Sequence, residues 1–295
     1  MRMNGRTKAV GIGMIAAVAG VAQAGGASGS GLVVLNASSN GALTMNGNAS
    51  IEIPTKIVYV NSSSPTAVQT VGKAVIDAPA LYVVGNASFG GNSGCTGSVI
   101  TGAPGIYDPL MHVVIPGSDG MESHGAVNIK QSSTPVTLTP GFYPDGLRVT
   151  GNASVELSPG VYVIGGGGLA ITSGDVVGQG VCLIIASGSC ELAGASSLTL
   201  SPIDSGPLAN IVLAQPSSNT AAMRLVGGSE FNVTGTIYTP KSTLTLVGNS
   251  QIEGTGPQMG DLVIADRVSL SGTASIRIGR DHLPQVSLPS MPLYD

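Results

Sequence analysis

The stretch that decides the fold is Leu147-Arg-Val-Thr-Gly151-Asn-Ala-Ser-Val-Glu-Leu157. Every second residue from Leu147 onward is small or apolar, whereas the residues between them are polar. This period of two is typical of a strand that buries one face. Because glycine is unfavourable in the middle of a strand, Gly151 predicts a sharp bend at which two short strands meet.

The same alternation recurs along the chain, with a glycine in the equivalent slot of most copies. The copies lie at residues 43–53, 81–89, 190–200, 223–233, 244–252 and 268–278, with a degenerate copy at 169–173. Short apolar runs precede several of them, at residues 160–164, 180–185, 210–213, 235–238 and 260–264. We interpret these runs as a third strand in each repeat.

The spacing of the bends gives the period. Equivalent positions fall at residues 151, 173, 194, 227, 248 and 272, which is about 22 residues per turn with one longer interval that predicts an inserted loop at 202–218. The interval from Gly85 to Gly151 is long enough for three turns whose copies are obscured. The period predicts an all-β fold, a single-stranded right-handed parallel β-helix (solenoid) over residues 25–280.

Composition agrees with a layered core of small side chains. Charged residues make up 9% of the chain and aromatic residues 3%, with 44 glycines and no tryptophan. The basic residues are few and scattered, so the electrostatic signature of a nucleic-acid-binding protein is missing. We therefore expect no nucleic-acid partner.

The first 24 residues have the pattern of an export signal. Arg2, Arg6 and Lys8 precede an apolar run at 9–22, and Ala22-Gln23-Ala24 fits a cleavage site. Cleavage would leave nine basic and sixteen acidic residues, a formal charge of −7. The alternative, a retained membrane anchor, would want an apolar run of about 20 residues. The pattern predicts an exported protein, in the periplasm, on the cell surface or secreted, with no transmembrane span after cleavage.

Three cysteines leave two interpretations open. Cys182 and Cys190 are near enough in sequence to form a disulfide in an exported protein, with Cys95 left over. Alternatively they are small apolar core residues, because each lies in an alternating strand pattern. Their spacing does not suggest zinc, and we expect neither a metal nor a cofactor.

One segment, residues 107–124, is dense in polar chemistry. It contains the candidate binding residues Asp108, His112, Asp119, Glu122 and His124. Such groups bind metals or sugars when they converge. The alternative is an exposed loop whose groups never meet, since Pro116-Gly117 and Asp119-Gly120 mark turns. We assign no catalytic residue, because the acidic pairs that glycan-cleaving enzymes use are not apparent.

Four strings carry a resemblance to a known group. They are Leu138-Thr-Pro-Gly-Phe-Tyr143, Leu147-Arg-Val-Thr-Gly-Asn-Ala-Ser154, Pro159-Gly-Val-Tyr-Val-Ile-Gly-Gly-Gly167 and Gly235-Thr-Ile-Tyr-Thr-Pro240. Residues 31–280 resemble the β-helical region of proteins associated with the Flp/Tad (tight adherence) pilus, the TadG-like group. The resemblance implies an extracytoplasmic structural or adhesion protein. Such proteins commonly carry a hydrophobic helix and a helical linker before the solenoid, whereas here the repeats begin soon after Ala24.

A weaker likeness connects the chain to bacterial ice-binding β-solenoids, which share the Leu-Thr-Pro-Gly-x-Tyr corner and a Gly-Thr-Ile segment. That function needs a flat, regular, threonine-rich face. In sequence order, Thr44, Thr150, Thr245 and Thr273 are too irregular to predict one.

We therefore expect a non-enzymatic, exported structural or adhesion-type module at the bacterial cell surface, with association to a Tad pilus as the finer hypothesis. Its expected partner is a surface protein or a polysaccharide. The alternative is a polysaccharide lyase or hydrolase of the β-helix type, and an ice-binding-like solenoid is the third hypothesis. Residues 281–295, which contain Pro284, Pro289 and Pro292, are expected to form a tail or a cap.

Overall fold

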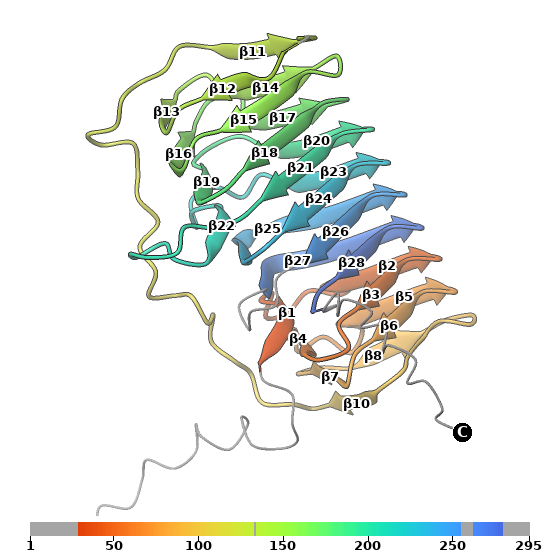
Figure 1. The fold of residues 1–295 in the computed structure, drawn as a ribbon. Coiled ribbons are helices and arrows are strands. Elements are labelled where there is room, and N and C mark those ends of the chain that lie inside the picture. Colours follow the sequence, from red (N-terminus) through yellow and green to blue (C-terminus); the bar gives the residue numbers. More distant parts are fainter. Residues whose placement is uncertain (1–28, 133, 255–261, 280–295) are drawn as a thin grey trace, which may run out of the picture.

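The computed structural model describes residues 29–132, 134–254 and 262–279, and all regular structure in these ranges is β-strand. The strands are parallel and stack coil upon coil into a solenoid of about ten turns, with neighbouring coils about 23 residues apart (Figure 1). The predicted fold class is confirmed. Residues 1–24 and 281–295, expected to be a signal and a tail or cap, lie outside the described residues.

Each coil contributes one strand to each of three faces. Face 1 contains, in spatial order, β13 (Gly141–Tyr143), β16 (Gly160–Ile164), β19 (Val181–Ile185), β22 (Ile211–Ala214), the first part of β25 (Thr236–Gly248), the first part of β27 (Leu262–Gly272), β1 (Ser30–Val34), β4 (Ile57–Val60), β7 (Ala80–Val83) and β10 (Ser98–Thr101).

Face 2 runs in the same direction. It contains β11 (Val127–Lys130), β14 (Leu147–Thr150), β17 (Leu169–Thr172), β20 (Cys190–Gly194), β23 (Met223–Gly227), the last parts of β25 and β27, β2 (Leu43–Gly47), β5 (Val68–Gly72) and β8 (Ala87–Phe89). Faces 1 and 2 form one continuous sheet because β25 and β27 turn the corner between them.

Face 3 is a separate sheet. It contains β12 (Val136–Leu138), β15 (Ser154–Leu157), β18 (Asp175–Gly178), β21 (Ser197–Leu200), β24 (Glu230–Val233), β26 (Gln251–Gly254), β28 (Ser275–Arg277), β3 (Ser50–Glu52), β6 (Val75–Asp77) and β9 (Gly94–Cys95).

The order of the coils in space differs from their order in the sequence. The first coil, β1 to β3, lies in the middle of the stack, and the chain descends from it to β10 at one end (Figure 1). Residues 102–126, which we call the strap, then run back along the solenoid to β11 at the opposite end (Figure 1). From there the coils return to β27 and β28, which stack on β1, β2 and β3. We call this contact the junction.

The expectation of three obscured turns between Gly85 and Gly151 was wrong, because the strap occupies much of this interval. Gly85 follows β7 at the corner between faces 1 and 2, and the bend glycine of that coil is Gly91, after β8. The copy at 81–89 therefore spans two faces. Alternating apolar residues on both sides of Gly85 produced the same pattern by chance, because the period of two says nothing about which corner a glycine occupies.

The remaining bend glycines turn the chain from face 2 to face 3 and stack on one another. Gly47, Gly72, Gly248 and Gly272 have φ between +79° and +90°, a left-handed conformation that costs residues with a Cβ atom. A Cβ atom added to Gly248 would lie 3.1 Å from the carbonyl oxygen of Gly227 in the next coil. The predicted corner is thus restricted both by backbone angle and by close packing between coils.

Replacement of a bend glycine separates these two restrictions. We expect Gly248→Ala to lower the free energy of unfolding by more than the roughly 1–2 kcal/mol that a left-handed residue costs alone, because its methyl group also meets the Gly227 carbonyl. Gly206→Ala is the matched control: φ is +90°, with nothing within 4 Å of the added Cβ atom. Equal losses in urea denaturation would show that packing between bends contributes nothing.

The solenoid has two hydrophobic cores. The inner core fills the coils with alternating residues of all three faces. A second, outer core covers the outward side of face 1, so strands such as β19 and β22 are buried on both sides. Two-sided burial explains why face 1 reads as continuous apolar runs and faces 2 and 3 as alternation.

The cysteines belong to these cores and are present as free thiols. Cys182 lies in the outer core and Cys190 in the inner core, so the two thiols occupy opposite sides of the sheet. Burial raises the pKa of each to about 12. Cys182 and Cys190 are therefore core residues, and they do not form a disulfide with each other.

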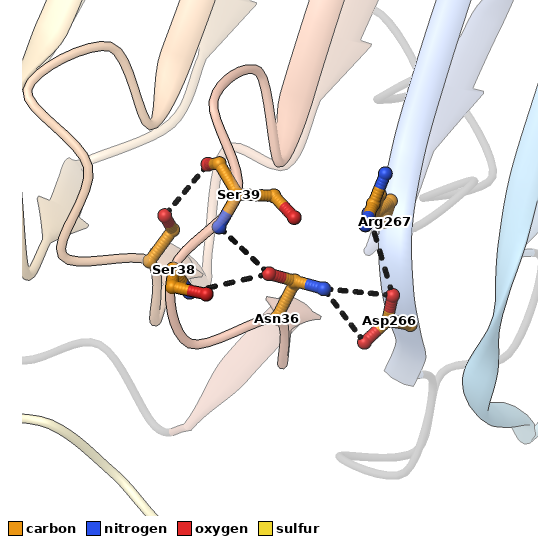
Figure 2. A network of polar contacts seen from close by, with 6 residues as sticks. Asn36, Ser38, Ser39, Asp266 and Arg267 are labelled. Atoms are coloured by element: carbon orange, nitrogen blue, oxygen red, sulfur yellow. Dashed lines mark hydrogen bonds and ion pairs between the residues drawn. The ribbon is translucent and has the colours of Figure 1, made fainter.

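Polar contacts reinforce the junction. Backbone bonds run from the amides of Leu35 and Asn36 to the carbonyls of Ala265 and Asp266, at 2.8 and 2.9 Å. Figure 2 shows the Asn36 side chain donating to both carboxylate oxygens of Asp266, at 3.0 and 3.2 Å, while Arg267 approaches the same carboxylate at 3.5 Å.

Two further interactions stabilise the same contact. The Asn36 side-chain oxygen accepts bonds from the amides of Ser38 and Ser39 (Figure 2). On face 3, Arg277 in β28 pairs with Glu52 in β3 at 3.4 Å. The junction therefore carries two side-chain ion pairs, Arg267 with Asp266 and Arg277 with Glu52.

We expect Asn36→Ala to destabilise the protein by about 1–3 kcal/mol, because Asp266 loses the Asn36 donor and the amides of Ser38 and Ser39 lose their acceptor. Urea denaturation measures the loss, and hydrogen exchange should accelerate first in β1 and β27. Asn92→Ala, at an exposed bend, should change stability by less than about 0.5 kcal/mol. Uniform acceleration of exchange along the whole solenoid would contradict a local role at the junction.

Candidate functional site

The strap carries all five residues that the sequence singles out. It lies along the outward side of face 1 (Figure 1), and its inward side chains Ile106, Leu110, Val113 and Ile115 belong to the outer core. The intervening Tyr107, Met111 and Val114 are 86%, 57% and 78% exposed. The strap is therefore held against the solenoid by its apolar side.

Asp108 anchors the strap to face 1. One of its carboxylate oxygens accepts a bond from the Tyr238 hydroxyl in β25 at 2.7 Å, and the other accepts from the Leu110 amide at 2.9 Å. Burial, followed by the bond to Asp108, raises the pKa of Tyr238. Both oxygens are thus engaged in holding the segment in place.

His124 has a different role at the opposite end of the strap. Its ring stacks on Tyr143 with centroids 4.6 Å apart, and Tyr143 stacks on Tyr162 at 5.9 Å. Its Nε2 lies 3.1 Å from the carbonyl oxygen of Pro140. Burial raises the pKa of Tyr143 to about 12, and its hydroxyl donates to the Thr139 carbonyl at 2.6 Å. His124 therefore extends an aromatic stack at the corner of the solenoid.

The other three candidates point to solvent. His112, Asp119 and Glu122 are exposed, and the backbone carbonyl of Glu122 accepts a hydrogen bond from the Phe142 amide at 2.7 Å. The described residues contain no group of three or more His, Cys, Asp or Glu side chains that is arranged to hold a metal ion. The structure distributes the five residues along the strap.

A groove of about 320 Å³ lies beside the Asp108 anchor. Its polar lining includes Tyr238, Lys241 and Ser217, and the rest is apolar: Met111, Val113, Ile115, Pro216 and Pro240. Asp108 is the one carboxylate among these lining residues. Hydrolysis of a glycosidic bond ordinarily uses two carboxylates on opposite sides of the bond. The described lining residues include one carboxylate, that of Asp108.

A second candidate site lies on face 2 and is assembled by the coil order. Register places Thr245, Ser269, Thr44, Gln69 and Ser88 directly beside one another on five consecutive rungs. We call this column the polar ladder. A parallel column contains Val247, Ser271, Asn46 and Val71. Strand spacing sets the rungs about 4.8 Å apart.

The polar ladder is half-buried to exposed and uncharged. A shallow groove of about 290 Å³ lies over its lower part, lined by Thr44, Asn46, Gln69, Val71 and Ser88 among others. The other half of face 2 differs in character, because it presents Lys130, Arg148, Glu191 and Arg224 outward. The outward residues of face 2 are therefore mostly charged in one half and mostly uncharged hydrogen-bonding groups in the other, where Arg267 in β27 is also exposed.

The sequence did not predict this site, because Ser269 in β27 and Thr44 in β2 become neighbours only at the junction. A signal was present: Leu43-Thr-Met-Asn-Gly47, Leu244-Thr-Leu-Val-Gly248 and Val268-Ser-Leu-Ser-Gly272 share a hydroxyl in the same slot. Nothing in the sequence placed the first of these copies next to the last.

Comparisons with family models, with curated proteins and with solved structures gave no match to this chain. Within the described ranges, no helix has the length and apolar character needed to cross a membrane. The site geometry and the sequence patterns therefore carry the functional argument.

We expect Asp108→Ala to lower the free energy of unfolding by about 1–2 kcal/mol, because the hydroxyl of the buried Tyr238 loses its acceptor. His112→Ala, on the exposed side of the same segment, should stay within about 0.5 kcal/mol of the wild type. Urea denaturation of both variants and of the Asp108→Ala/Tyr238→Phe double variant measures the coupling. Additive losses in the double variant would disprove the anchor.

Proposed function

We propose that the protein is a non-enzymatic structural module of the adhesion type, displayed outside a bacterial cell, and that its polar ladder binds uncharged polysaccharide. The observation that carries this proposal is the uninterrupted run of hydroxyl and amide side chains from Thr245 to Ser88, which lie in register on five consecutive strands of face 2.

The chemistry of the ladder suits a neutral glycan. Hydroxyl and amide groups donate and accept hydrogen bonds, as sugar hydroxyls do, and binding them requires no desolvation of a charge. The valines beside them, Val247 and Val71, offer apolar contact to sugar rings. Because parallel strands fix the rungs, little conformational entropy is lost on binding, and many weak contacts add along a repeating polymer.

Export and surface display rest on the sequence. The basic and apolar pattern of residues 1–24 and the resemblance of residues 31–280 to the TadG-like group support an extracytoplasmic location, with association to a pilus as the finer proposal. A polysaccharide or a surface protein is the partner that fits this location.

The ladder also favours a second candidate, an ice-binding-like function. Thr245, Ser269 and Thr44 form a regular hydroxyl row that their sequence positions conceal. The glycan-cleaving alternative has weaker support, because both oxygens of Asp108 are engaged and its described neighbours in the groove include no second carboxylate.

A charge at the centre of the ladder tests the proposal. We expect Ser269→Arg to weaken co-sedimentation with insoluble neutral polysaccharides by about tenfold or more, equivalent to about 1.4 kcal/mol. Thr199→Arg, the same class of change on exposed face 3, should bind as the wild type does.

Three readouts on the same samples distinguish the hypotheses. Loss of binding in Ser269→Arg alone supports the adhesion function. Release of reducing ends or unsaturated products by the wild type would instead establish an enzyme. Inhibition of ice growth that Ser269→Arg abolishes, without glycan binding, would replace the first candidate with the second.

A further inference from the structure

Strand β10 forms an open edge at one end of the solenoid. Among the described residues, β8, β9 and β10 each pair on one side only, with β5, β6 and β7. One inner-core column on face 1 runs through Leu32, Val58, Leu81 and Val99. The first three side chains are fully buried, whereas Val99 is 40% exposed because β10 is the last rung of the described face. One further strand below β10 would complete this column.

The backbone of β10 is open on the same side. The Ser98 amide donates to the Pro79 carbonyl in the preceding coil at 3.1 Å. Backbone groups alternate in direction along a strand, so the amides of Val99 and Thr101 point to the open side. Natural edges commonly carry charges or prolines that oppose further pairing, but residues 86–103 contain neither. The edge is therefore a template for another strand.

The opposite end of the solenoid is better protected. There β11 and β12 pair with β14 and β15 on one side only, as far as the described strands go. However, β11 carries Lys130, Pro135 directly precedes β12, and Ser123 of the strap bridges to Phe142 in β13. Of the two ends, the β10 edge is the one with less protection.

The last coil of the sequence offers no such edge, because β28 pairs with both β26 and β3. The described chain leaves β28 at Gly279, where an added Cβ atom would lie 2.7 Å from the Thr55 hydroxyl at the corner between faces 3 and 1. The same corner continues through Pro79 to Gly97, directly before β10. The pairings β28–β3, β3–β6 and β6–β9 make three rungs, and the position below β10 is a fourth, at about 19 Å from Gly279. Six residues of extended chain span about 20 Å.

We propose that the chain caps this edge itself: residues 280–285 descend along the corner, and Val286-Ser-Leu288 adds to β10 as a parallel strand. The two apolar side chains of this strand lie below Val99 and Thr101 and close the inner core, while the serine faces outward. The apolar, polar, apolar order of the three residues matches the alternation of a strand that buries one face.

The rest of the C-terminal sequence suits a cap. Pro289 and Pro292 follow the proposed strand, and because proline has no amide donor, pairing ends there. Arg280, Asp281 and Asp295 supply the charges that a terminal element of a solenoid needs on its outer side. The cap lies below face 1, whereas the polar ladder lies on face 2, so this inference does not rest on the proposed polysaccharide binding.

Hydrogen exchange at Val99 and Thr101 tests the cap. In the full chain we expect both amides to exchange at least about tenfold more slowly than in a chain that ends at Gly279, because the added strand accepts their hydrogen bonds. The amides of β11, at the opposite end, should exchange equally in the two proteins, since the cap does not reach them.

Point variants of the full chain make the test independent of the shortened protein. Leu288→Asp places a charge at an inward position of the proposed strand, and it should release Val99 and Thr101 to fast exchange. Ser287→Asp is the matched control, because it places the same charge on the outward side of the same strand. Its exchange should stay within about twofold of the wild type. Circular dichroism verifies that both variants are folded.

A disulfide tests the register directly. In a Cys95→Ser background, Thr101→Cys and Leu288→Cys should form an intramolecular disulfide in dilute protein, because directly paired residues on neighbouring strands are close enough to bridge. Thr101→Cys with Ser287→Cys should not, since the second thiol faces outward.

Four outcomes would overturn the proposal. Fast exchange of Val99 and Thr101 in the full chain would do so, as would slow exchange that persists in Leu288→Asp. Equal loss of protection in Leu288→Asp and Ser287→Asp would show that no inward side chain closes the core. Protection that increases with protein concentration would assign the edge to a second copy of the chain instead.

Discussion

Backbone pairing across the junction is the interaction on which the rest of the structure depends. Without the contact of β1–β3 with β27 and β28, the chain would be two short solenoids joined by the strap, each with one more open edge. The contact closes the inner core, brings Asn36 to Asp266, and creates the central rungs of the polar ladder. Stability and the candidate binding surface therefore share one origin.

The strap complements the junction on the outside. Face 1 is apolar on both sides, and its outward residues would form a long exposed hydrophobic surface if the strap did not cover them. The connection between the two parts of the chain is thus also a structural layer. This explains why Asp108 and His124, which look like candidate ligands in the sequence, are engaged in anchoring and stacking.

Local pattern predicted the strands, the period and the glycine corners, because alternation and bends depend on neighbouring residues. It predicted neither the order of the coils nor the strap, because the pairing of Leu32 with Val263 joins residues that no local period connects. Gly85 shows the limit clearly: its alternating neighbours fit the repeat, but it occupies another corner. For the same reason Thr44 and Thr245 appeared irregular in sequence order, although one rung separates them in space.

The strap also couples the number of coils to the length of one connection. Solenoids ordinarily gain or lose repeats freely, since each repeat contacts only its neighbours. Here each added coil would lengthen the stack by about 4.8 Å and require roughly one and a half more residues of extended strap. A duplication of one repeat would therefore have to draw on the turns at Asp108–Met111 and Ser118–Met121 or be matched by an insertion there. Variation in size during evolution is expected to be concerted in this architecture, with repeats and strap changing together.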